Sequence, residues 1–139
     1  MSVELYALTA VALLAASLWI PYIAGVNTSE PGSPADADSK DFSRPANPAL
    51  QRPWVRRAYR AHLNLLEQGM PFAILVLIAF QLGISSGVTV WASVLFVALR
   101  LAHAIGMITG MARFPARPII FTAAWACCIA IGVEILRLG

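Results

Sequence analysis

The chain has 139 residues, of which 59% are hydrophobic and 12% are charged, and its mean hydropathy is +0.72. Soluble domains carry about 25% charged residues, so this composition indicates a membrane protein and excludes a sizeable soluble domain. The formal net charge of +3 could suit nucleic acid. However, the basic residues alternate with apolar runs and form no basic face with aromatic positions, so we expect no nucleic-acid partner.

Four apolar segments are long enough to cross a bilayer as helices, which takes roughly 20 residues each. The first is predicted at about 5–26 and the second at about 54–82, where the sequence QLGISSG interrupts it with glycine and serine. The third covers about 88–111, and after the turn RFPARP the fourth covers about 118–138. We therefore predict an all-α fold, in which residues 1–139 form a single integral-membrane four-helix bundle.

The connection between the first two spans differs in composition from the rest of the chain. Residues 27–53 contain five of the nine prolines and most of the acidic residues. This composition is typical of a flexible connector. A lid over a cytoplasmic site is the alternative interpretation.

The basic residues indicate how the chain is oriented in the membrane. The turn between the second and third spans has no charge. The other two connections, with the start of the second span, contain Lys40, Arg44, Arg52, Arg56, Arg57, Arg60, Arg113 and Arg117. The positive-inside rule places both basic connections in the cytoplasm and both termini on the opposite side.

The second span begins with polar residues at helical spacing. In the sequence RAHLNLLEQGMPF, Arg60, Asn64, Glu67 and Pro71 fall at i, i+4, i+7 and i+11, which places them on one stripe of a helix. Ionisable side chains within a span normally face the bundle interior or a water-filled cavity. We therefore expect this stripe to face inwards.

The third span carries a similar stripe of Arg100, His103 and Met107. The two stripes should face each other or a shared ligand. Glu67 and Arg100 lie at similar distances from the predicted cytoplasmic ends of their helices, which predicts a buried ion pair between them. Such a pair could also serve only to fix the register of the two helices.

Arg117 lies beside Pro118, a residue suited to the first turn of a helix. A cation at a helix N-terminus opposes the helix dipole, so Arg117 is unfavourable there unless an anion binds. A guanidinium combined with a helix N-terminus forms a favourable anion site.

These segments together resemble the MAPEG superfamily, membrane-associated proteins in eicosanoid and glutathione metabolism. The segment RAHLNLLEQGMPF matches the second-helix signature RAHxNxxExxxPF of that family. The resemblance is closest to the microsomal prostaglandin E synthase and glutathione transferase branch. RLAHAIG is similar to the third-helix RxAH of that branch, and PAR at 115–117 is similar to its Pro-x-Arg before the fourth helix.

The resemblance implies a homotrimer that holds glutathione, as co-substrate, between subunits on the cytoplasmic side. By position, Arg60, Asn64, Glu67 and His103 would bind the tripeptide, and Arg117 would be the catalytic residue that stabilises its thiolate. A cation beside a thiol lowers its pKa and yields the nucleophilic thiolate. The implied activity is that of a glutathione transferase or glutathione-dependent peroxidase, acting on a hydrophobic small molecule that enters from the lipid bilayer.

The sequence also departs from the family pattern. Met107 replaces a third-helix tyrosine, Gln68 replaces a residue that is aromatic in some members, and the end of the first span, WIPYIAGVN, lacks arginines that eukaryotic members carry. A non-catalytic lipid-binding or structural membrane scaffold of the same fold is therefore the alternative. The two histidines lie on different helices without a carboxylate at metal-site spacing, so we expect no metal.

Overall fold

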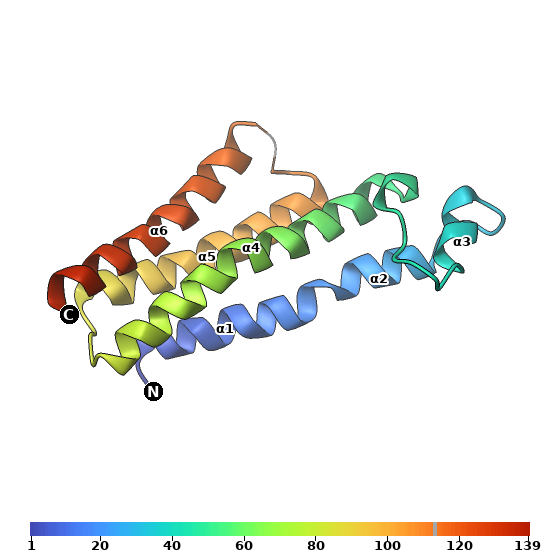
Figure 1. The fold of residues 1–139 in the computed structure, drawn as a ribbon. Helices are drawn as coiled ribbons and strands as arrows, with labels where there is room; N and C mark the ends of the chain where they lie inside the picture. The colour runs from blue at the N-terminus through green and yellow to red at the C-terminus, as the bar shows by residue number, and fades with distance from the viewer. Residues whose placement is uncertain (113) are drawn as a thin grey trace.

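The computed structural model describes residues 1–112 and 114–139. Four apolar helical segments run alternately in opposite directions along one bundle (Figure 1). Their helices are α1 (Val3–Leu18), α2 (Ile20–Asn27), α4 (Pro53–Gln81), α5 (Gly87–Thr109) and α6 (Ala116–Leu138). No strand occurs in the described residues, and each of the four segments is long and apolar enough to cross a membrane. The prediction of an all-α four-helix membrane protein is confirmed.

The first span differs from the prediction in one respect, because it is broken at Trp19 into α1 and α2. Pro21 lies in the first turn of α2 and has no backbone N–H to donate to the carbonyl of Ser17. The break is therefore placed by a residue that is visible in the sequence. Arg113, which contributed to the predicted orientation and to the depth assigned to Arg100, lies outside the described residues.

The core lies between α1, α4, α5 and α6, with α5 in contact with each of the other three. At its centre Phe72 of α4 and Phe96 of α5 are fully buried, with stacked rings whose centroids are 4.1 Å apart. Large apolar side chains such as Trp91 and Trp125 are exposed on the outside of the bundle. A surface of this kind suits contact with lipid rather than water.

A buried carboxylate joins the start of α1 to the start of α5. Glu4 Oε1 accepts hydrogen bonds from Ser85 Oγ at 2.8 Å and from Thr89 Oγ1 at 2.7 Å. These two hydroxyl donors offset part of the cost of burying the carboxylate, which lies inside the bundle at the end that carries both termini.

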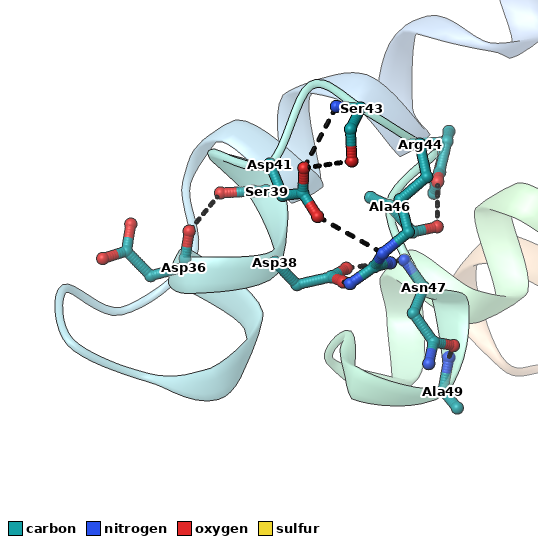
Figure 2. A network of polar contacts seen from close by, with 10 residues as sticks. Asp36, Asp38, Ser39, Asp41, Ser43, Arg44, Ala46, Asn47 and Ala49 are labelled. Atoms are coloured by element: carbon teal, nitrogen blue, oxygen red, sulfur yellow. Dashed lines mark hydrogen bonds and ion pairs between the residues drawn. The ribbon is translucent and has the colours of Figure 1, made fainter.

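The connection between the first two spans contains a short helix, α3 (Pro34–Ser39), and a 3₁₀ turn, η1 (Pro48–Leu50). Asp38 is buried, accepts a hydrogen bond of 2.6 Å from the Asn47 N–H and forms an ion pair with Arg44 (Figure 2). Asp41 Oδ1 accepts hydrogen bonds from the backbone N–H and the hydroxyl of Ser43. The segment with the composition of a flexible connector thus holds a defined polar network.

Candidate functional site

A cavity of about 780 Å³ lies where α4, the end of α5 and the start of α6 meet. It is lined by Arg60, Asn64, Glu67, His103, Ala112, Phe114, Arg117, Pro118 and Phe121. The structure therefore brings all five residues that were assigned to glutathione binding or thiolate stabilisation into one wall. Their roles remain predictions. No lining residue comes from the connection at 28–52, so the described residues give no support to the lid interpretation.

Helical spacing on α4 places three of the polar groups in this cavity. Arg60 and Glu67 are exposed in the isolated chain, and Asn64 between them is half-buried. Pro71, one turn further on, has no N–H to donate to the backbone carbonyl of Glu67. The wall therefore offers a guanidinium, an amide and a carboxylate in a row of about two turns.

Arg100 lies behind this wall rather than in it. Its guanidinium is buried and donates from Nη1 to Asn64 Oδ1 at 2.8 Å. The Cζ atom lies 5.9 Å from the ring centroids of both Phe96 and Phe121. Nε and Nη2 are buried and have no hydrogen-bond partner in the described part of the chain. Burying a cation with so few hydrogen-bond partners costs free energy. Arg100 therefore depends on its hydrogen bond to Asn64, and the same bond holds the Asn64 amide in place.

The predicted ion pair between Glu67 and Arg100 is not formed in the described residues of the single chain. The described residues contain no contact between these two side chains within the 4.0 Å limit of a salt bridge. The two residues differ in environment, because Arg100 is buried between helices whereas Glu67 is exposed on the cavity wall. Matching depth along two helices therefore did not produce a pair, and Arg100 bonds to Asn64, about one turn earlier on α4.

His103 and Arg117 complete the wall from the other two helices. His103 is buried and lies nearly one turn after Arg100 on α5. Arg117 is the second residue of α6, which begins at Ala116, two residues before the predicted start. The first turn of α6 has no side-chain cap, so its N-terminal dipole and the exposed Arg117 guanidinium both favour an anion here.

The sequence argument used Arg56 and Arg57 only to orient the chain and did not assign them to a site, whereas in the structure they line a second pocket beside the cavity. The signal was present, since Arg56 lies four residues before Arg60 on the same helical stripe. Met107 and Gln68 are the two residues that depart from the family pattern within the second and third spans. Met107 lines this second pocket. Gln68 is buried and donates from Nε2 to the Phe121 carbonyl at 3.3 Å. Gln68 therefore joins α4 to α6 instead of facing the cavity.

A model of the MAPEG family matches residues 6–137 of the chain. No curated protein matches the chain. The matched range includes the second and third spans, all but the outermost residues of the first and fourth, and every residue that lines the cavity.

Proposed function

Since the chain belongs to the MAPEG family, we propose that it is a membrane-bound enzyme of the glutathione transferase type. The family contains glutathione transferases and related glutathione-dependent enzymes, and also members that are not catalytic. The proposal is that the cavity binds glutathione and activates its thiol towards a hydrophobic molecule dissolved in the bilayer.

The charge pattern of the cavity is the observation that carries this proposal. Glutathione has two carboxylates, one ammonium group and one thiol. Guanidinium groups such as that of Arg60 bind carboxylates through paired, charge-assisted hydrogen bonds. Among the described residues that line the cavity, Glu67 is the only acidic one, and it would accept the ammonium group. The volume of the cavity, about 780 Å³, falls within the usual range for small-molecule sites.

Arg117 is the catalytic residue in this proposal. A free thiol has a pKa of about 8.5, and a neighbouring cation or helix N-terminus lowers it. Arg117 provides the cation and the uncapped first turn of α6 provides the dipole. A thiol bound here would lose its proton near neutral pH and become a nucleophile.

Two reactions are open to such a thiolate. In conjugation, the sulfur forms a bond to an electrophilic carbon and the leaving group departs with its electron pair. In peroxide reduction, the sulfur takes one oxygen, the alkoxide leaves and is protonated, and a second glutathione then gives the disulfide and water. Both start from the same thiolate, so both depend on Arg117.

Asn64 and Arg100 act as a positioning pair in this scheme. Asn64 lines the cavity, and its amide oxygen is held by the buried guanidinium. Because Oδ1 is occupied by Arg100, the Nδ2 group of Asn64 is left to donate to a ligand in the cavity. Arg100 itself does not line the cavity and would act through Asn64.

The alternative function is lipid binding without catalysis, and two observations favour it. Met107 offers no hydroxyl where many family members have tyrosine. An apolar groove of about 670 Å³ lies between α4 and α6, with Pro71 and Trp125 among its lining residues. A groove of this kind suits a lipid chain as well as a substrate.

We further propose that three copies assemble, with the termini on the non-cytoplasmic side. Arg60, Glu67 and Arg117 are exposed in the single chain, although they belong to membrane-spanning helices. Covering these groups with a neighbouring subunit would shield them from lipid. Native mass spectrometry in mild detergent should show trimers, and a purely monomeric protein would contradict this assembly.

The function is tested by titrating detergent-solubilised protein with glutathione in a calorimeter and by following turnover of a generic aromatic electrophile. Wild-type protein should bind glutathione and turn over the electrophile. Arg60→Ala should weaken binding about 10- to 100-fold through the loss of a charged hydrogen bond, whereas Lys40→Ala, in the exposed connection, should bind normally. Binding without turnover would favour the scaffold alternative, and absence of binding would refute the proposal.

A further inference from the structure

Beside the glutathione cavity lies a smaller pocket of about 410 Å³ with an unusual lining. Four of its lining residues are arginines, and the full set is Pro53, Arg56, Arg57, Arg60, Met107 and Arg117. Over the described residues, none of these four arginines forms an ion pair with an acidic side chain. Like charges gathered in one concave pocket focus a positive potential and favour the binding of an anion.

The position of Arg57 in this pocket is fixed by the end of α5. Its Nε and Nη2 both donate to the Ile108 carbonyl at 3.4 Å. Its guanidinium also lies against Gly110, where an added Cβ would come within 3.3 Å of Cζ. Gly110 caps α5 with a φ of +80°, so a residue with a side chain would be strained there as well as crowded. The Arg57 guanidinium is therefore held at the pocket by contacts within the protein.

The length of α4 allows the pocket to lie at the level of the lipid headgroups. The 29 residues of α4 span about 44 Å, whereas the hydrocarbon core of a bilayer is about 30 Å thick. The first turns of α4, which carry Arg56 and Arg57, can therefore extend beyond the hydrocarbon. The end of α5 and the start of α6 lie at the same end of the bundle (Figure 1).

The composition of the lining separates this pocket from the glutathione cavity. Glutathione needs an acidic partner for its ammonium group, and Glu67 provides one in the larger cavity. None of the described residues that line the smaller pocket is acidic. A phosphate group needs only cations and matches the planar fork of arginine. Basic pockets between membrane helices are typical binding sites for anionic headgroups.

We propose that this pocket binds the phosphate of an anionic lipid headgroup, with Arg56 and Arg57 as ligands of its own. Arg60 and Arg117 line both the pocket and the glutathione cavity. A headgroup that occupies the pocket therefore competes with glutathione for these two guanidinium groups. Lipid binding is independent of the proposed enzymatic function, whereas the competition rests on it.

The test uses full-length protein in nanodiscs that contain phosphatidylcholine with or without phosphatidate of the same acyl chains. Native mass spectrometry counts the lipids retained after gentle release. Arg56→Gln and Arg57→Gln should each lower phosphatidate retention about fivefold. Lys40→Gln is the matched control, because it removes one charge from an exposed side chain in the connection before α4. Arg56 is exposed and its side chain forms no ion pair with any described residue, so its variant should fold normally.

Two results of this experiment would overturn the proposal. Equal retention by wild-type protein and Arg56→Gln would exclude the pocket as the lipid site. An equal loss of phosphatidate retention in Lys40→Gln would show that the lipid responds to general surface charge and not to the pocket. Inorganic phosphate forms the second arm: phosphatidate should remain bound in its presence, and displacement by inorganic phosphate at equal concentration would overturn the lipid assignment.

Glutathione titrations in the same nanodiscs separate this inference from the proposed function. Phosphatidate should weaken glutathione binding to wild-type protein, and less so to Arg56→Gln. If Arg56→Gln weakens glutathione binding in pure phosphatidylcholine fivefold or more, the pocket belongs to the glutathione site and the inference fails alone. If wild-type protein retains phosphatidate but binds no glutathione, the proposed function fails and the lipid site stands.

Discussion

The side chains of Arg100 and Asn64 are joined by a hydrogen bond of 2.8 Å from Nη1 to Oδ1, directly behind the wall of the 780 Å³ cavity. This bond links α5 to α4 and gives a buried guanidinium its one hydrogen bond in the described residues. Because Arg100 is buried and Asn64 is half-buried, the pair is shielded from water and should contribute measurably to stability.

A double-mutant cycle measures this contribution. Asn64→Ala leaves the buried guanidinium without its partner and should lower the free energy of unfolding by about 1.5–3 kcal/mol. Combined with Arg100→Gln, the two losses should be strongly non-additive, whereas Glu67→Gln with Arg100→Gln should be additive within about 0.5 kcal/mol. Unfolding in mixed detergent micelles provides the measurement. A larger coupling energy between Glu67 and Arg100 than between Asn64 and Arg100 would support the ion pair and contradict this account.

Close packing at Gly25 gives a second prediction. A Cβ at this position would lie 2.5 Å from Val55 Cγ2 and 2.8 Å from Trp54 Cη2, so Gly25→Ala forces α2 away from α4. Overpacking of this kind costs about 1–3 kcal/mol of stability. Val55→Ala should recover part of the loss. Gly132→Ala is the control, because its new Cβ meets only Leu75 Cδ2 at an ordinary 3.6 Å. Equal losses from both glycine variants would contradict the packing argument.

The polar network between the first two spans should depend on pH. The hydrogen bond from Lys40 holds the pKa of Asp36 below its ordinary value of 3.8, and the hydrogen bond from the Ser43 hydroxyl does the same for Asp41. A carboxylate with a lowered pKa stabilises the folded segment above 3.8, and this stabilisation is lost as the pH falls through the lowered pKa. The network should thus be intact from neutral pH to about pH 4 and weaken below it.

Hydrogen exchange at Gly32 and Ser43 reports on this network, because their N–H groups donate to Asp36 and Asp41 at 3.0 Å. Protection, corrected for intrinsic exchange rates, should stay constant from about pH 6 to about pH 4 and fall below about pH 4. Asp36→Asn should remove the pH dependence at Gly32 and preserve it at Ser43. Unchanged protection at both amides across this range would show that neither carboxylate holds the segment.

The spans were predictable because the hydrophobic effect acts on runs of about 20 residues, which remain readable without knowledge of the partners. Every predicted span end lies within two residues of an observed helix end. The stripe of Arg60, Asn64 and Glu67 was predictable for a related reason, since helical periodicity alone places these residues on one side. Periodicity also covered Arg56, which the sequence argument failed to include.

The sequence does not reveal which side chains on different helices contact each other. Glu67 and Asn64 differ in position by less than one turn, and only the rotation of α4 against α5 decides which of them meets Arg100. The same holds for Gln68, whose bond to the Phe121 carbonyl depends on how closely α6 approaches α4. In the connection at 27–53, the burial of Asp38 depends on contacts between residues nine positions apart, such as its bond to Asn47.

The most direct test of the central claim is the ultraviolet absorbance of a thiolate when the protein is mixed with glutathione at neutral pH. We expect wild-type protein to show this signal and Arg117→Ala to lose it while still binding glutathione, because Arg60, Asn64, Glu67 and His103 remain in the cavity. Turnover by Arg117→Ala should fall mainly in kcat, whereas Arg60→Ala should lose affinity. Wild-type protein that binds glutathione without forming any thiolate would contradict the account.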